Sequence, residues 1–321
     1  MRTAKLAVAA LCACGSSSTP TPIGTRVGPA LSAALGAADT VRAPWRCAAA
    51  DGPALADETL KAGEHSWQLA GHTMTLAGSG TISIGVVADA GGSAPATLAA
   101  IGRVRTQLED VDLVLALGGM GSTKEELEAT LGALAERATW PLVAIPGDLE
   151  PAGAHAAAVA ALRARALVVI DGRLVRRIDL PGAHVAVVPG ASSEKRLVAG
   201  DDGCGYAATD VGAMMVDLTS RPGLRILASA EAPRITVDGE PAGMLALTPG
   251  ALQELDLVLH GPVTEAASAG RTGTRDGAAA PLSPGTLDAT TRLPGPRHPA
   301  SAGVLTISGN AWRWKPIADS K

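Results

Sequence analysis

Aromatic residues are nearly absent from this sequence of 321 residues: it contains no Phe, five Trp and one Tyr. A hydrophobic core must therefore be built from Ala, Val, Leu and Ile. Apolar residues make up 47% of the chain. A chain of this length and apolar content can bury one large core or two small ones.

An excess of positive charge is also lacking. The chain has 27 basic and 31 acidic residues and a formal net charge of -4. Domains that bind nucleic acid usually carry a basic patch or stripe, and no RNA- or DNA-binding signature interrupts this sequence. We therefore expect no nucleic acid among its partners.

The apolar run near the amino terminus is too short to span a bilayer. It covers residues 6 to 13, whereas a spanning helix needs about 20 residues. With Arg2 and Lys5 before it, the run fits the core of a secretory signal. The tetrapeptide Leu11-Cys12-Ala13-Cys14 resembles the lipobox of bacterial lipoproteins, in which the last Cys is acylated and becomes the first mature residue.

The lipobox resemblance implies a signal peptide over residues 1–13 and lipidation of Cys14. The protein would then be exported and anchored to a membrane by its lipid. Gly15 stands where an Asp typically retains such proteins at the inner membrane, which favours the outer membrane, facing the periplasm or the cell surface. An ordinary signal cut near Ala13 remains the alternative.

Metal-binding cysteine patterns are missing. No CxxC and no Cys/His cluster occurs, which argues against a structural zinc site. Beyond the signal and Cys14, only Cys47 and Cys204 remain. In an oxidising compartment these two permit a disulfide, although their spacing alone does not show one.

Residues 14–64 are predicted to be a flexible, lipid-anchored tether, because most of this segment is rich in Ser, Thr, Pro, Gly and Ala and has almost no apolar periodicity. The folded domain is predicted over residues 65–321, beginning with a hairpin over 65–78. Strands and helices then alternate, which indicates βαβ units and a largely parallel sheet. The strands are expected over 81–89, 111–119 and 141–147, and the helices over 94–110, 122–138 and 153–166.

The second half has a different rhythm. We expect three short strands over 167–190, a helix over 208–220, and a closing hairpin over 303–317. Two further strands are expected over 224–230 and 255–261. Residues 266–303 are predicted to be a long loop, rich in Gly, Pro, Thr and Arg.

Carboxylates follow several of the predicted strands. The stretch "WPLVAIPGDLEP", residues 140 to 151, is an apolar strand that ends at Gly147 and is followed by Asp148 and Glu150. Asp89 follows the strand over 81–89 in the same way. Open α/β sheets usually keep their sites at the carboxyl ends of strands, so these residues are the candidates.

This order of strands, helices and strand-end residues resembles the calcineurin-like metallophosphoesterase superfamily over about residues 80 to 317. The resemblance implies an α/β (α+β) fold, a four-layer sandwich of two mixed β-sheets flanked by helices. Members of that family hold two divalent metals at successive strand ends. The metals bridge a phosphate ester and activate water for in-line attack.

At most of the positions where the family has metal ligands, this sequence has residues whose side chains carry neither a carboxylate nor an imidazole to bind a metal. Only Asp89 and Asp148 remain as oxygen donors, in what would be a vestigial metal site. The places where the family has a His or Asp ligand, or its catalytic His, are occupied by Gly91, Gly119, Leu149, Ala230, Pro262 and Thr264.

Two carboxylates cannot hold a two-metal centre, so the resemblance implies an inactive member that has no catalytic residues and for which no cofactor is expected. Its function would be binding or scaffolding at the cell envelope, with an envelope protein or a small anionic ligand as partner. The alternative is a weak phosphoesterase that binds one Mn or Mg through Asp89, Asp148 and Glu150. A third alternative is an unrelated α/β binding protein that shares only the architecture.

The charged residues named as candidates, and several others, could have purely structural roles instead. Asp89 and Asp148 also suit hydrogen bonds to backbone N–H groups at the turns that follow them. Glu231 and Glu265 are expected to be solvated. Four arginines of the long loop form a possible anion-binding loop, or else only keep a flexible loop soluble: Arg271, Arg275, Arg292 and Arg297.

The stretch "GGMGSTKEE", residues 118 to 126, is comparable to phosphate-binding loops, because it follows a strand and opens a helix. The P-loop pattern needs Lys followed by Ser or Thr. Here Glu125 follows Lys124 and would repel phosphate. We therefore interpret the stretch as an ordinary start of a helix.

Overall fold

The computed structural model describes residues 46–49, 51–192, 197–198, 202–237, 240–243, 245, 252–275, 277–288 and 299–319. These residues belong to one compact unit that spans Ala43–Lys321. The predicted signal, lipidation site and most of the predicted tether lie outside the described residues. Among the described residues, no helix is long and apolar enough to cross a membrane.

Seven strands form the first sheet, in the order β14-β17-β16-β4-β5-β6-β7. Its second half is parallel, and β16, β17 and β14 extend it in antiparallel fashion. The strands are β4 (Thr81–Val87), β5 (Leu113–Leu117), β6 (Leu142–Ile145), β7 (Val169–Asp171), β14 (Arg271–Thr274), β16 (Ser301–Ser308) and β17 (Ala311–Ala318).

Eight strands form the second sheet, in the order β1-β2-β3-β8-β9-β10-β13-β15, which is also mixed. A separate pair, β11 (Ile235–Val237) and β12 (Glu240–Ala242), is antiparallel. The strands of the second sheet are β1 (Leu55–Ala62), β2 (His65–Gly71), β3 (Thr73–Leu76), β8 (Arg177–Leu180), β9 (Ala183–Val188), β10 (Leu224–Ser229), β13 (Leu257–His260) and β15 (Ala280–Leu282).

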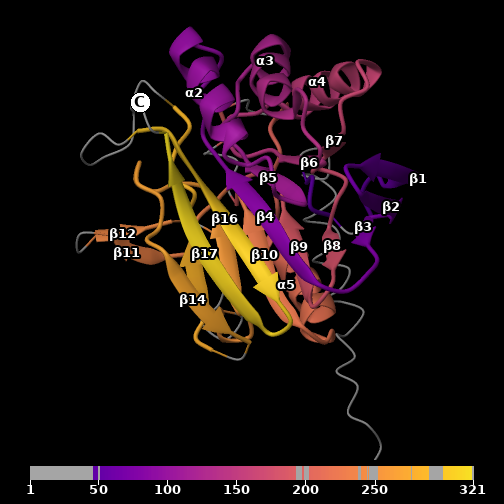
Figure 1. Cartoon of the computed structure of the whole chain (residues 1–321), viewed down its shortest axis with the longest axis vertical. Coiled ribbons are helices and arrows are strands. Elements are labelled where there is room, and N and C mark those ends of the chain that lie inside the picture. The colour runs from indigo at the N-terminus through magenta and orange to yellow at the C-terminus, as the bar shows by residue number, and fades with distance from the viewer. Residues whose placement is uncertain are drawn as a thin grey trace, which may run out of the picture. The chain divides into compact units, whose positions relative to one another are not determined.

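Helices cover the outer faces of both sheets. An apolar cluster joins the first sheet to α2 (Pro95–Thr106), α3 (Lys124–Ala135) and α4 (Ala152–Ala164). Another joins the second sheet to α5 (Ala208–Thr219). Figure 1 shows α2, α3 and α4 grouped together and α5 apart from them, beside β9 and β10. The fold is therefore the predicted sandwich of two mixed sheets flanked by helices.

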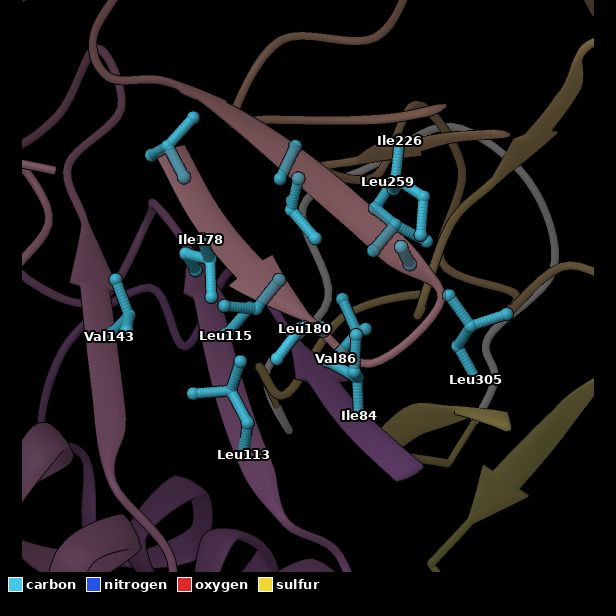
Figure 2. Packing of buried hydrophobic residues seen from close by; sticks show 14 of the residues in the cluster. Ile84, Val86, Leu113, Leu115, Val143, Ile178, Leu180, Ile226, Leu259 and Leu305 are labelled. Atoms are coloured by element: carbon cyan, nitrogen blue, oxygen red, sulfur yellow. The ribbon is translucent and has the colours of Figure 1, made fainter. Parts of the chain in front are cut away.

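The largest core lies between the two sheets. Figure 2 shows Ile84, Leu115 and Val143 of the first sheet facing Ile178 and Ile226 of the second. Continuous apolar strands such as β5, buried at every residue, are typical of parallel sheets covered on both faces. Trp67 and Trp314 supply much of the aromatic bulk of this core and are almost completely buried.

Two predicted boundaries were wrong. Residues 55–62 were assigned to the tether, but they form β1, which pairs with β2. Polar and apolar residues alternate strictly only from Thr59 to Ala62, within a segment of loop-like composition.

The predicted long loop over 266–303 likewise contains β14, β15 and the start of β16. β14 is an exposed edge strand, so it lacks the apolar pattern by which strands are recognised.

Candidate functional site

Residues from five strands meet at one end of the sheets. Asp89 follows β4, Gly118 and Gly119 follow β5, Gly147 follows β6, and Ala230 follows β10. A Cβ atom placed on Gly118 would lie 2.8 Å from the Gly147 nitrogen and 2.9 Å from Ala230 Cβ. One placed on Gly261, after β13, would lie 2.1 Å from the Ala230 carbonyl oxygen. We call these six residues the strand-end cluster.

The backbone of Gly119 lies directly against Asp89. A Cβ atom on Gly119 would be 2.8 Å from Asp89 Cα and 2.9 Å from Asp89 Oδ1, closer than real Cβ contacts. Gly119 also has φ of 71°, in the region that favours glycine. A carboxylate side chain at this place would therefore require Asp89 or the backbone of Gly119 to shift.

The segment between β15 and β16 forms hydrogen bonds to Asp89. The Thr286 hydroxyl donates to the Asp89 carbonyl at 2.7 Å and to Asp89 Oδ2 at 3.1 Å. The backbone N–H groups of Leu287 and Asp288 donate to the same carbonyl. At Gly91, the family's His place, an added Cβ would lie 2.6 Å from Asp288 Oδ2. Part of the predicted long loop thus packs on Asp89 and Gly91, the positions after β4 where the resembled family has metal ligands.

Glu150 joins two loops of this end of the sheet. Its Oε1 accepts from the Met120 N–H at 2.6 Å, and its Oε2 accepts from the Gly147 N–H at 2.8 Å. The side chain is 1% exposed. Burial raises the pKa of the Glu150 carboxyl to about 7, although these N–H donors act in the opposite direction. Its oxygens are thus used to connect the loops after β5 and β6.

Asp148, the other carboxylate that follows β6, is half-buried. Its carbonyl oxygen accepts from the Val198 N–H at 2.9 Å. No group of three or more His, Cys, Asp or Glu side chains among the described residues is arranged to hold a metal ion. Together with the packing of Gly119 on Asp89, this means that the described residues do not fit the two-metal centre of the resembled family.

The prediction that Glu231 and Glu265 are solvated was wrong, since both are buried. The Tyr206 hydroxyl donates to Glu231 Oε2, and the Ser192 N–H donates to the same oxygen at 3.1 Å. Tyr206 lies 25 residues away in sequence, so no local pattern reveals the pair. The one available signal is that Tyr206 is the single tyrosine of the chain.

His260 ends β13 and is 2% exposed. Its Nδ1 lies 2.7 Å from the Gly261 carbonyl oxygen, to which it donates. Burial lowers the pKa of this imidazole to about 4, although the hydrogen bond to Gly261 acts in the opposite direction. His260 is therefore neutral near pH 7.

In the loop that resembles a phosphate-binding loop, backbone N–H groups donate hydrogen bonds to carboxylates of the chain itself. Glu126 Oε2 accepts from the Ser122 N–H at 2.8 Å and from the Ser122 hydroxyl at 2.9 Å. Met120 donates to Glu150. Thr123 caps α3 by accepting from the Glu126 N–H. The stretch is the start of a helix, as the sequence indicates.

The remaining predicted site residues are dispersed or undescribed. Cys47 and Cys204 form a disulfide with a Cα–Cα distance of 5.4 Å. Arg271 lies in the exposed edge strand β14, and the Arg275 N–H donates to the Asn310 carbonyl. Arg292, Arg297 and Cys14 lie outside the described residues, so the anion-binding loop stays a prediction.

No protein-family model matches this chain, and no curated protein does. Solved structures do match. Purple acid phosphatase PPD1 from yellow lupin (Lupinus luteus) seeds is 10% identical, with a TM-score of 0.51 over 80% of this chain and 57% of that one. The chain has a metallophosphoesterase-like fold.

At this low identity the likeness concerns the fold alone. A further solved structure, 12% identical, has a TM-score of 0.52 and covers 75% of this chain and 100% of its own. TT1561 of Thermus thermophilus, 14% identical, covers 72% of this chain and 99% of its own with a TM-score of 0.48, too low to add support. The chemistry of the strand-end cluster is therefore judged from its own residues and not from these structures.

Proposed function

We propose that this chain is an exported, lipid-anchored protein whose metallophosphoesterase-like domain binds or scaffolds at the cell envelope without hydrolysing phosphate esters. The observation that carries the proposal is the packing of Gly119 against Asp89, where an added Cβ would lie 2.8 Å from Asp89 Cα. A bridging carboxylate has no room there. The oxygens of Glu150 are already used by backbone donors.

Export is supported by the lipobox-like tetrapeptide and by the disulfide. Stable disulfides form mainly in oxidising compartments such as the bacterial periplasm. The disulfide joins Cys47, within the segment predicted as the tether, to Cys204 of the folded domain. A lipid on Cys14 would then hold the folded domain near a membrane surface.

Metal content and hydrolysis test the proposed inactivity. The full-length chain is purified with and without added manganese, and its metal content and its rate on a chromogenic phosphodiester are measured. Asp89→Asn is the test variant, and Asp110→Asn, at an exposed position, is the matched control. We expect less than stoichiometric metal and the same background rate in all three proteins. One metal ion per chain, with hydrolysis lost only in Asp89→Asn, would instead establish the one-metal phosphoesterase.

Metabolic labelling with an alkyne fatty acid tests the anchor. Expressed in a bacterial host, the wild-type chain is expected to take up the label and to fractionate with membranes. Cys14→Ser should lose the label, whereas Cys12→Ser should keep it. Label that persists in Cys14→Ser, or an unlabelled wild-type chain, would refute the lipid anchor.

A further inference from the structure

A cavity of about 170 Å³ lies between the second sheet and α5. Its lining comes from β3, β8 and β9, from α5, and from Ala48 beside the disulfide. No residue of the strand-end cluster lines it. Its volume is close to that of an engineered cavity of about 150 Å³ that binds benzene. We call it the α5 cavity.

The walls are mainly apolar: Ala48, Ala186, Ala213, Met214 and Leu218. Three of these five side chains are single methyl groups. Among the residues that line the cavity there is no Trp or Tyr whose side chain could fill the space that they leave. Met214 is flexible and adapts its shape to what it contacts. The cavity therefore has the size and lining for one compact apolar group.

Ion pairs and the disulfide fix the positions of these walls relative to one another. Arg46 pairs with Asp210 in the first turn of α5. Arg177 on β8 donates to Asp217 of α5 at 2.6 Å. These links cross-connect the strap at residues 46–49, the helix and the sheet. The cavity is thus fixed by contacts outside its apolar lining, so it is preformed.

Two hydrogen-bonding side chains at the cavity have unused capacity. Among the described residues, no hydrogen bond is formed by the Thr73 hydroxyl or by the Nη2 atom of Arg177. Arg177 otherwise pairs with Asp179 and Asp217. A few convergent polar groups in an apolar pocket are the usual means by which a ligand is oriented.

Two aspartates also line the cavity, and each is paired with an arginine: Asp210 with Arg46 and Asp217 with Arg177. Arg176 is the remaining charged residue of the lining. Arg176 is 8% exposed and donates to the carbonyl oxygens of Cys47, Ala49, Arg173 and Val175. It forms no ion pair with a carboxylate of the described residues. Burial lowers the pKa of its guanidinium to about 10, with Asp210 and Asp171 opposing the effect, so it stays charged at pH 7. A buried cation of this kind attracts anions more strongly than one in water.

We infer that the α5 cavity binds a small carboxylate with a compact apolar body, of the size of benzoate. The apolar body lies against Ala186 and Met214, and the carboxylate faces Arg177 and Thr73, in the field of Arg176. This site is independent of the proposed loss of phosphoesterase chemistry, because it shares no residue with the strand-end cluster.

Titration calorimetry of the full-length chain with sodium benzoate at pH 7 tests this inference. Ala213→Leu fills the mouth from an exposed position of α5, and Ala208→Leu makes the same change at an exposed position that does not line the cavity. We expect one saturable site, weakened about tenfold or more by Ala213→Leu and unchanged by Ala208→Leu, since about 1.4 kcal/mol corresponds to a factor of ten. Thr73→Val should also weaken binding, and benzyl alcohol, which has no charge, should bind at least about tenfold more weakly than benzoate.

Three results would overturn the inference. The first is no saturable binding up to about 10 mM benzoate, which corresponds to a binding free energy of less than about 3 kcal/mol. The second is equal binding of benzoate by Ala213→Leu and wild type. The third is binding of benzyl alcohol as tight as that of benzoate. Circular dichroism of each variant shows whether it is folded. If Ala213→Leu does not fold, the comparison of benzoate with benzyl alcohol and the Thr73→Val variant still decide the matter.

Discussion

Glu150 connects the loops after β5 and β6, the loops that carry metal ligands in the resembled family. Glu150→Ala would leave the buried N–H groups of Met120 and Gly147 without their acceptors. Each buried donor left unsatisfied costs about 1–3 kcal/mol. We therefore expect the free energy of unfolding to fall by at least about 1 kcal/mol, measured by chemical denaturation at pH 5. A variant as stable as wild type would show that these bonds contribute nothing.

The pH dependence of the same residue has a definite sign. Burial raises the pKa of Glu150 to about 7 from 4.5. The folded state therefore binds more protons than the unfolded state between these values. The stabilising contribution is complete below about pH 4.5 and is lost as the pH rises to about 7. The difference in stability between wild type and Glu150→Ala should consequently be larger at pH 5 than at pH 8. Equal differences at the two pH values would contradict the raised pKa.

Gly119 is the residue at which the family's chemistry is hardest to restore. In Gly119→Asp, the added Cβ meets Asp89 Cα, and φ of 71° is unfavourable for a side chain. Such a backbone conformation alone costs about 1–3 kcal/mol. We expect a loss of stability in this range or above, with no gain in manganese binding. Gly102→Asp on α2 is the control, because nothing lies within 4 Å of an added Cβ there. Stoichiometric manganese in a stable Gly119→Asp would refute the packing argument.

At the scale of elements, the sequence predicts those whose pattern is local. The alternation of β4 to α4 and the closing hairpin of β16 and β17 follow from apolar periodicity and turn residues. β1 and β14 were missed because neither has a sustained apolar pattern along its residues. The candidate site was predicted in part: its positions were found through the resemblance. The hydrogen bonds of Glu150 and Glu231 were not predicted, because they depend on loops that meet only in the folded chain.

The disulfide holds the amino-terminal strap to the loop before α5. Its two cysteines are 157 residues apart, so it closes a long loop in the unfolded chain. By loop-closure entropy such a link contributes about 4–5 kcal/mol, with typical measured values of about 2–4 kcal/mol. We expect Cys47→Ser/Cys204→Ser to lose stability on this scale and to match reduced wild type in guanidinium denaturation. A double variant as stable as oxidised wild type would show that the strap is held by its other contacts, such as the bonds from Arg176.

At the scale of the whole domain, both sheets depend on one shared core. The sequence predicts the apolar strands, but it does not show which strand faces which across the sandwich. That arrangement is a property of the complete topology, in which β8 pairs with β3 and β9 while β7 pairs with β6. Both the strand-end cluster and the α5 cavity are built on strands of this sandwich, so their geometry depends on the core between the sheets.

Leu115 on β5 lies in that core and is completely buried. Leu115→Ala removes methyl groups from the interface of the two sheets and should cost about 2–5 kcal/mol. Because both sheets share the interface, amide hydrogen exchange should accelerate in β5 and also in β8 to β10. Leu60→Ala, at a partly buried position of the edge strand β1, is the control and should accelerate exchange only in β1 and β2. Faster exchange confined to the first sheet in Leu115→Ala would show that the two sheets unfold separately.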